Sequence, residues 1–135
     1  MARINFQNLP NTTTPVNATN LNSMQDLELT TGTELATEQI IDTKRVYHKR
    51  LYESFLPNNT YYDYDSGLSN VTIIKCEATS YDTNGDVYCI PYVGSALSDN
   101  IGIKWIANTN KVRITTGTNR NSFVCYIDLY YTKNL

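Results

Sequence analysis

The feature that most constrains this fold is a long alternating segment followed by the dipeptide Asn84-Gly85. Between residues 71 and 81, Ile74, Cys76 and Ala78 alternate with polar residues, which is the period of a strand with one buried face. Asn-Gly favours the two-residue turn that joins antiparallel strands. A two-residue loop here predicts four pairs on the inward face: Asp82 with Val87, Ser80 with Cys89, Ala78 with Pro91, and Cys76 with Val93.

Other segments show the same alternation. Apolar residues occupy every second position in 101–107, in 112–114 and in 123–131, where Cys125 and Ile127 face inward and Tyr126 faces outward. Residues 39–41 and the segment from Arg45 are expected to form a hairpin across Asp42-Thr43. Tyr47, Leu51 and Phe55 have helical spacing but also share one strand face, and the branched and aromatic content favours a strand. Short strands with regular turns predict an all-β, antiparallel β-sandwich, jelly-roll-like in type.

The first residues of the 135-residue chain have a different composition. They are polar, rich in Asn and Thr, and too poor in apolar side chains to fold alone, so they are disordered or borrow a core from a partner. Thr14 before Pro15 is a helix start signal, and an apolar stripe follows at three-residue spacing. We therefore expect an attachment arm with a short helix at 1–28, a linker at 29–37 and a β-sandwich head at 38–135. The stripe predicted to mediate oligomerisation is Ala18, Leu21, Met24 and Leu27.

The segment 11–22, Asn-Thr-Thr-Thr-Pro-Val-Asn-Ala-Thr-Asn-Leu-Asn, resembles the start of small virion appendage proteins of tailed bacteriophages. The stretches 38–47, 56–60 and 67–70 resemble the β-rich head of such proteins, although family members often place a glycine where this chain has Asp42-Thr43-Lys44. The resemblance implies a homotrimer in the virion, made in the host bacterial cytoplasm and docked on other virion proteins. The residues expected to attach it are Ile4, Phe6, Leu9, Pro15, Val16, Asn17, Asn20 and Leu21.

Chemical motifs are sparse, which predicts a protein that is not an enzyme and needs no cofactor or metal. His48 is the only histidine and is expected on a solvated strand face, and the three cysteines are expected to be buried free thiols. Asp82, Asn84 and Asp86 match the start of a calcium loop, but its glycine and terminal glutamate are missing, so they are expected in a turn. The net charge is −2, no segment is apolar enough to span a bilayer, and neither nucleic acid nor membrane is expected as a partner.

Tyrosine is the most informative residue type, with eleven copies against three phenylalanines. Outward tyrosines suit the binding of protein or sugar, and they equally suit a trimer interface. Two functions stay open: a head that binds a host surface receptor, and an architectural head fibre or connector decoration. A depolymerase would need an acidic pair such as Asp63 and Asp65 in a groove. The face expected to contact receptor or partner is Tyr61, Tyr62, Tyr64, Tyr88, Tyr92, Tyr126 and Tyr130.

Overall fold

The computed structural model describes residues 30–134, which form an all-β, antiparallel fold. This confirms the predicted fold class at that level. The predicted arm, its helix and the oligomerisation stripe lie outside the described residues. The strands are β1 (Glu34–Ile41), β2 (Lys44–Glu53), β3 (Tyr61–Asp65), β4 (Val71–Tyr81), β5 (Val87–Ile90), β6 (Ile101–Ile106), β7 (Lys111–Thr116) and β8 (Val124–Lys133), with a 3-10 turn, η1, at Leu97–Asp99.

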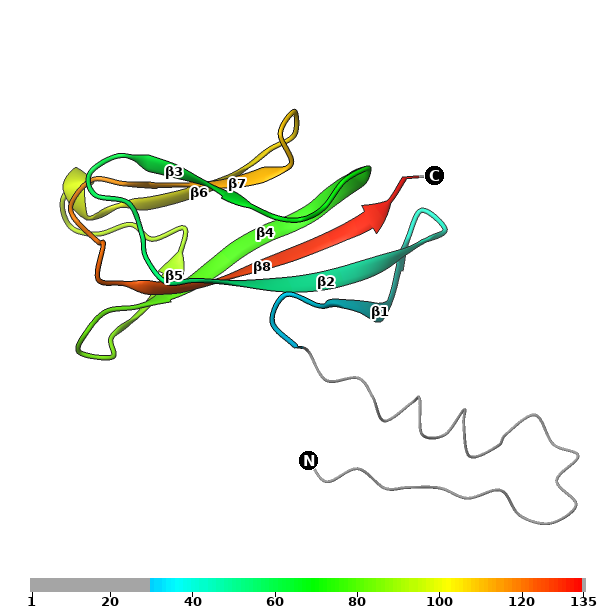
Figure 1. Cartoon of the computed structure of the whole chain (residues 1–135), viewed down its shortest axis with the longest axis horizontal. Coiled ribbons are helices and arrows are strands. Elements are labelled where there is room, and N and C mark those ends of the chain that lie inside the picture. The colour runs from blue at the N-terminus through cyan, green and yellow to red at the C-terminus, as the bar shows by residue number, and fades with distance from the viewer. Residues whose placement is uncertain (1–29, 135) are drawn as a thin grey trace, which may run out of the picture.

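The strands form two sheets that lie as two layers (Figure 1). The larger sheet has five strands in the order β1-β2-β8-β4-β5, and the smaller has three in the order β3-β7-β6. Strand β8 occupies the centre of the larger sheet, between β2 and β4. Its alternate residues Cys125, Ile127 and Leu129 are fully buried and share one core with Val112 and Ile114 of the smaller sheet. The alternation of β8 therefore gives this strand one face in the core and one face directed away from it.

The hairpin predicted across Asp42-Thr43 is confirmed. Strand β1 pairs with β2 up to Ile41 and Lys44, so Asp42 and Thr43 form a two-residue turn. Both have positive φ, at +49° and +66°, as the turns that match the right-handed twist of a hairpin require. Asp and Thr thus take the turn conformation that glycine would adopt most easily. Because β1 already begins at Glu34, the end of the predicted linker at 29–37 lies in this strand.

The hairpin at Asn84-Gly85 forms, but the predicted register is wrong by one residue. Ala78 pairs with Ile90 and Ser80 with Tyr88, whereas the two-residue loop predicted Pro91 and Cys89 as their partners. The connection is longer because Asp82 organises it: its Oδ1 accepts the backbone N–H groups of Asn84 at 2.8 Å and Asp86 at 2.9 Å. A register shift of one residue moves every side chain of the strand to the opposite face of the sheet.

That reversal decides which side chains of β5 are buried. Ile90 is buried and Tyr88 packs against the core, while Val87 and Cys89 are exposed. The predicted inward face of β4 is also corrected at one position. The register shifts between Ile73 and Lys75, and the residue at the irregularity, Ile74, is 42% exposed rather than buried. A bulge adds one residue to one strand, so the alternation restarts after it.

Candidate binding face

The face of the larger sheet that is directed away from the core is the candidate site, here called the outer sheet face. On β8 it carries Tyr126, Asp128 and Tyr130, because the intervening Ile127 and Leu129 are in the core. Residues paired across an antiparallel ladder share a face. The ladders of β8 with β2 and β4 therefore complete this surface with His48, Arg50 and Tyr52 from β2 and with Lys75, Glu77, Thr79 and Tyr81 from β4.

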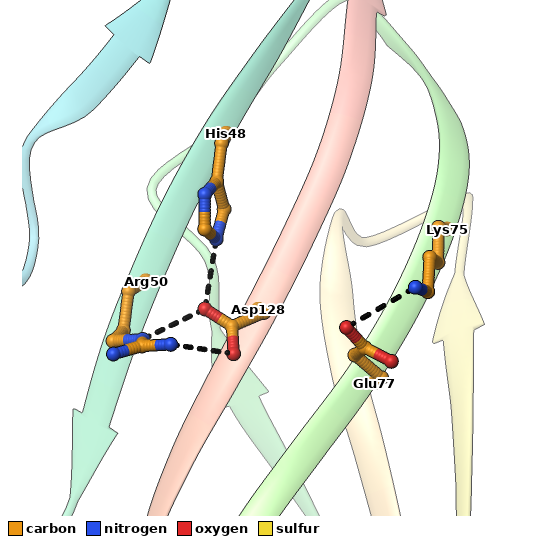
Figure 2. Close-up of polar contacts among 5 residues, drawn as sticks. All are labelled: His48, Arg50, Lys75, Glu77 and Asp128. Atoms are coloured by element: carbon orange, nitrogen blue, oxygen red, sulfur yellow. Dashed lines mark hydrogen bonds and ion pairs between the residues drawn. The ribbon is translucent and has the colours of Figure 1, made fainter. Parts of the chain in front are cut away.

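Asp128 is the centre of the outer sheet face (Figure 2). Its Oδ1 lies 2.8 Å from His48 Nε2 and accepts a hydrogen bond of 2.8 Å from Arg50 Nε. Its Oδ2 accepts a second bond from Arg50, at 3.2 Å. The side chain of Asp128 is only 8% exposed and that of His48 12% exposed. A carboxylate on an outward position of the sheet is thus largely removed from water and satisfied by its two neighbours.

The electrostatics of this cluster favour the charged carboxylate. Burial alone raises the pKa of Asp128, but the hydrogen bonds and charges of Arg50 and His48 outweigh burial, and the net pKa lies below its usual value. The bond with Asp128 in turn raises the pKa of the Arg50 guanidinium. Both shifts stabilise the ion pair over the pH range in which most proteins work.

Aromatic rings surround the Asp128 cluster. His48 stacks on Tyr130 with ring centroids 4.2 Å apart, and Tyr52 contacts Tyr126 at 5.3 Å. Tyr81 meets Tyr126 edge to face. Lys75 Nζ lies 5.5 Å from the centre of the Tyr130 ring and forms an exposed ion pair of 3.3 Å with Glu77 (Figure 2). Amphipathic rings beside fixed donors and acceptors form a surface suited to binding another molecule.

The tyrosines predicted as one face are distributed over three places. Tyr126 and Tyr130 lie on the outer sheet face as expected. Tyr61 lies on the outer face of the smaller sheet, 3.9 Å below the guanidinium of Arg113, which forms a bidentate pair with Asp63 at 2.7 and 2.8 Å. The prediction of a single tyrosine face is therefore wrong.

The remaining four tyrosines are directed toward the core. Tyr64 is fully buried and donates a hydrogen bond to the carbonyl oxygen of Phe55. The exposed Tyr62 contacts the aromatic ring of Phe55 at the edge of the core. Tyr88 and Tyr92 pack against the core and against each other, with ring centroids 5.0 Å apart. Tyr62 and Tyr64 share the inward face of β3 because they are two residues apart in the strand. Tyr88 faces inward because the register of β5 differs by one residue from the predicted register.

Sequence reasoning missed the part of the site that β2 contributes. His48 was expected on a solvated strand face, but Tyr130 and Asp128 cover it. The predicted face does not include Arg50 or Tyr52. The sequence signal was present, since the same strand has inward residues at 47 and 51 and its outward residues fall at 48, 50 and 52. What the sequence could not supply was the pairing of β2 with β8, which is a contact between segments about eighty residues apart.

The other predicted sites behave as ordinary structure. The cysteines are free, as predicted, but Cys89 is exposed rather than buried. Burial raises the pKa of Cys125 to about 12 and that of Cys76 to about 11, so both thiols stay protonated at neutral pH. Asp82, Asn84 and Asp86 form the expected turn. Within residues 30–134, no group of three His, Cys, Asp or Glu side chains is arranged to hold a metal ion.

Comparisons of the chain with protein-family models, with curated proteins and with solved structures gave no match. In the part of the chain that the structure describes, no helix has the length and apolar character needed to cross a membrane.

Proposed function

We propose that this chain is a short fibre or appendage protein of a tailed bacteriophage, whose N-terminal arm docks on the virion and whose β head binds a receptor on the host surface. The observation that supports binding by the head is the outer sheet face: a buried carboxylate fixed by His48 and Arg50 and ringed by tyrosines. The aromatic side chains of such a face are already held in place, so they lose little conformational entropy when a partner binds. The action proposed is binding without chemistry.

The arm and the head have separate roles in this proposal. The resemblance of residues 11–22 to appendage proteins supports attachment to the particle, and the stripe at Ala18, Leu21, Met24 and Leu27 supports a homotrimer. A trimer presents three heads and strengthens a weak head–receptor contact through avidity. Two antiparallel sheets with one shared core support the jelly-roll-like sandwich as the type of head.

A second candidate is an architectural role, as a capsid head fibre or a connector decoration. The observation that favours it is the position of β1, which begins at Glu34 and leaves no room for a long shaft between the arm motif and the head. In that case the outer sheet face contacts another virion protein. The two candidates share the anchor and differ in the partner of the head.

The anchor is tested by deletion of residues 1–27. We expect the shortened chain to fold, because strands β2 to β8 build a shared core within the residues that the structure describes, and to be absent from purified particles. The measurement is the amount of tagged protein in virions assembled with the full-length or the shortened chain. Equal incorporation of the two chains would refute the arm as the anchor.

The outer sheet face is tested by the double substitution Tyr52→Ala and Tyr126→Ala. We expect binding to intact host cells to weaken by about tenfold or more, since buried aromatic anchors typically contribute 2 kcal/mol or more to an interface. Tyr61→Ala is the matched control, because Tyr61 is an exposed tyrosine on the opposite sheet. If the control lost as much binding as the double variant, the outer sheet face would not be the receptor surface.

A further inference from the structure

A pocket opens beside the core, on the opposite side of the larger sheet from the outer sheet face. Its volume is about 350 Å³, at the lower end of the range for small-molecule sites. Glu34 and Lys133, from the inner faces of β1 and β8, form one wall with charged groups. The loop between β3 and β4 forms the other wall with Leu68, Ser69 and Asn70, and Val71 begins the next strand.

The charged groups at this pocket already have partners. Lys133 Nζ lies 2.6 Å from Glu34 Oε1, and the buried Tyr131 hydroxyl donates a hydrogen bond to Glu34 Oε2. Burial raises the pKa of Glu34, but the bonds from Lys133 and Tyr131 outweigh it and the net pKa is lowered. The carboxylate is therefore ionised and oriented. Lys49, which lies opposite Glu34 on β2, is engaged too, because its Nζ donates to the Ser66 carbonyl at 2.9 Å. A charged ligand would compete with these existing pairs, whereas a neutral ligand with hydroxyl groups meets both an acceptor and a donor.

The loop wall is held in place by hydrogen bonds within the loop and to the turn between β6 and β7. Ser66 Oγ donates to the carbonyl of Asn110 at 2.6 Å and accepts the Leu68 N–H at 3.1 Å. Asn70 and Asn134, which both line the pocket, are joined by two bonds, from Asn70 Nδ2 to the Asn134 carbonyl at 2.6 Å and from the Asn134 N–H to the Asn70 carbonyl at 2.9 Å. A preformed pocket loses little entropy when a ligand enters.

The pocket is amphipathic. Leu68 and Val71 pack against the core and line the pocket with apolar side chains, while Glu34, Lys133 and Ser69 line it with polar groups. A pyranose ring has the matching character, with C–H groups on its faces and hydroxyl groups at its edge. We propose that this pocket binds a neutral pyranose, with Glu34 accepting hydroxyl protons, Lys133 donating to ring or hydroxyl oxygens, and Leu68 and Val71 contacting the ring.

This inference does not depend on the outer sheet face. The pocket and that face lie on opposite sides of the larger sheet, and they share no residue. A sugar in the pocket would be either a free monosaccharide or the terminal residue of a glycan, and the chemistry of recognition is the same for both. The proposal stands or fails separately from a role of the tyrosines in binding.

The test is a titration of the ¹⁵N-labelled full-length chain with a panel of neutral methyl glycosides, followed by NMR. We expect saturable shifts at the amides of residues 67–71 and 133–134 for at least one glycoside. Ser69→Trp, which fills the pocket from an exposed position, should abolish those shifts, and Glu34→Gln should weaken binding by about tenfold. Thr83→Trp, at the tip of another hairpin, is the control and should leave the affinity unchanged.

Two further measurements make the outcome of the titration decisive. A glycan that ends in the same sugar separates terminal-sugar binding from binding of the free sugar only. Tyr52→Ala with Tyr126→Ala should leave glycoside affinity unchanged, which separates this site from the outer sheet face. The inference is overturned if no glycoside produces saturable shifts in these residues, if Ser69→Trp retains wild-type affinity in a folded chain, or if an anionic glycoside binds more tightly than its neutral counterpart.

Discussion

Asp128→Ala is expected to lower the free energy of unfolding by about 2–3 kcal/mol, because it removes the carboxylate that two neighbours share. His48 loses its hydrogen-bond partner while it remains covered by Tyr130. Arg50 is 41% exposed and can turn toward water, which keeps the loss below the value for a fully buried pair. The measurement is denaturant unfolding at neutral pH. Asp86→Ala, at an exposed turn carboxylate, is the matched control and should change stability by less than about 0.5 kcal/mol.

The same carboxylate gives stability a pH dependence with a defined sign. The pKa of Asp128 is lowered in the folded state, so its contribution to stability is complete above its unfolded pKa, at about 3.9, and is lost as the pH falls through the folded pKa. We therefore expect the stability difference between wild type and Asp128→Asn to be constant near neutral pH and to shrink on acidification below about pH 4. A difference that stays constant down to the lowest pH at which both chains fold would show that Asp128 carries no extra charge stabilisation.

Ile127→Ala is expected to have the largest effect on stability, a loss of about 2–5 kcal/mol in the free energy of unfolding. Ile127 is fully buried on the central strand β8, where it lies opposite Leu51 of β2 and Ala78 of β4. Truncation there leaves a cavity that three strands with fixed pairing cannot close.

Ile40→Ala is the control for the core substitution. Ile40 has the same side chain, in the edge strand β1, but is 62% exposed, so its truncation should cost less than about 0.5 kcal/mol. Thermal or denaturant unfolding of both variants measures the contrast. Equal losses at the two positions would contradict the placement of β8 at the centre of the core.

Local patterns predicted the strands well, because alternation depends only on which face of a strand is buried. The segments of β6, β7 and β8 follow it closely, and the turn at Asp42-Thr43 formed where the pattern placed it. The errors arose where one residue changes the outcome. The Asp82 side chain lengthened a turn that Asn-Gly alone predicts as two residues, and a bulge at Ile74 shifted the alternation of β4.

The site was less predictable than the fold, since it depends on which strands become neighbours. Tyr126 and Tyr130 could be placed on an outward face from β8 alone. That His48 and Arg50 lie beside Asp128 follows from the pairing of β2 with β8, which no local pattern encodes. For the same reason, one set of seven tyrosines with similar local patterns is divided in the structure between two outer faces and the core.

The most direct test of the central claim is the binding of labelled full-length protein to intact host cells, measured beside its ability to block phage adsorption. The account predicts saturable binding and reduced adsorption, with both effects diminished by Tyr52→Ala and Tyr126→Ala. A folded chain that binds no cells and leaves adsorption unchanged would contradict receptor binding, and the partner of the outer sheet face would then be sought among other virion proteins.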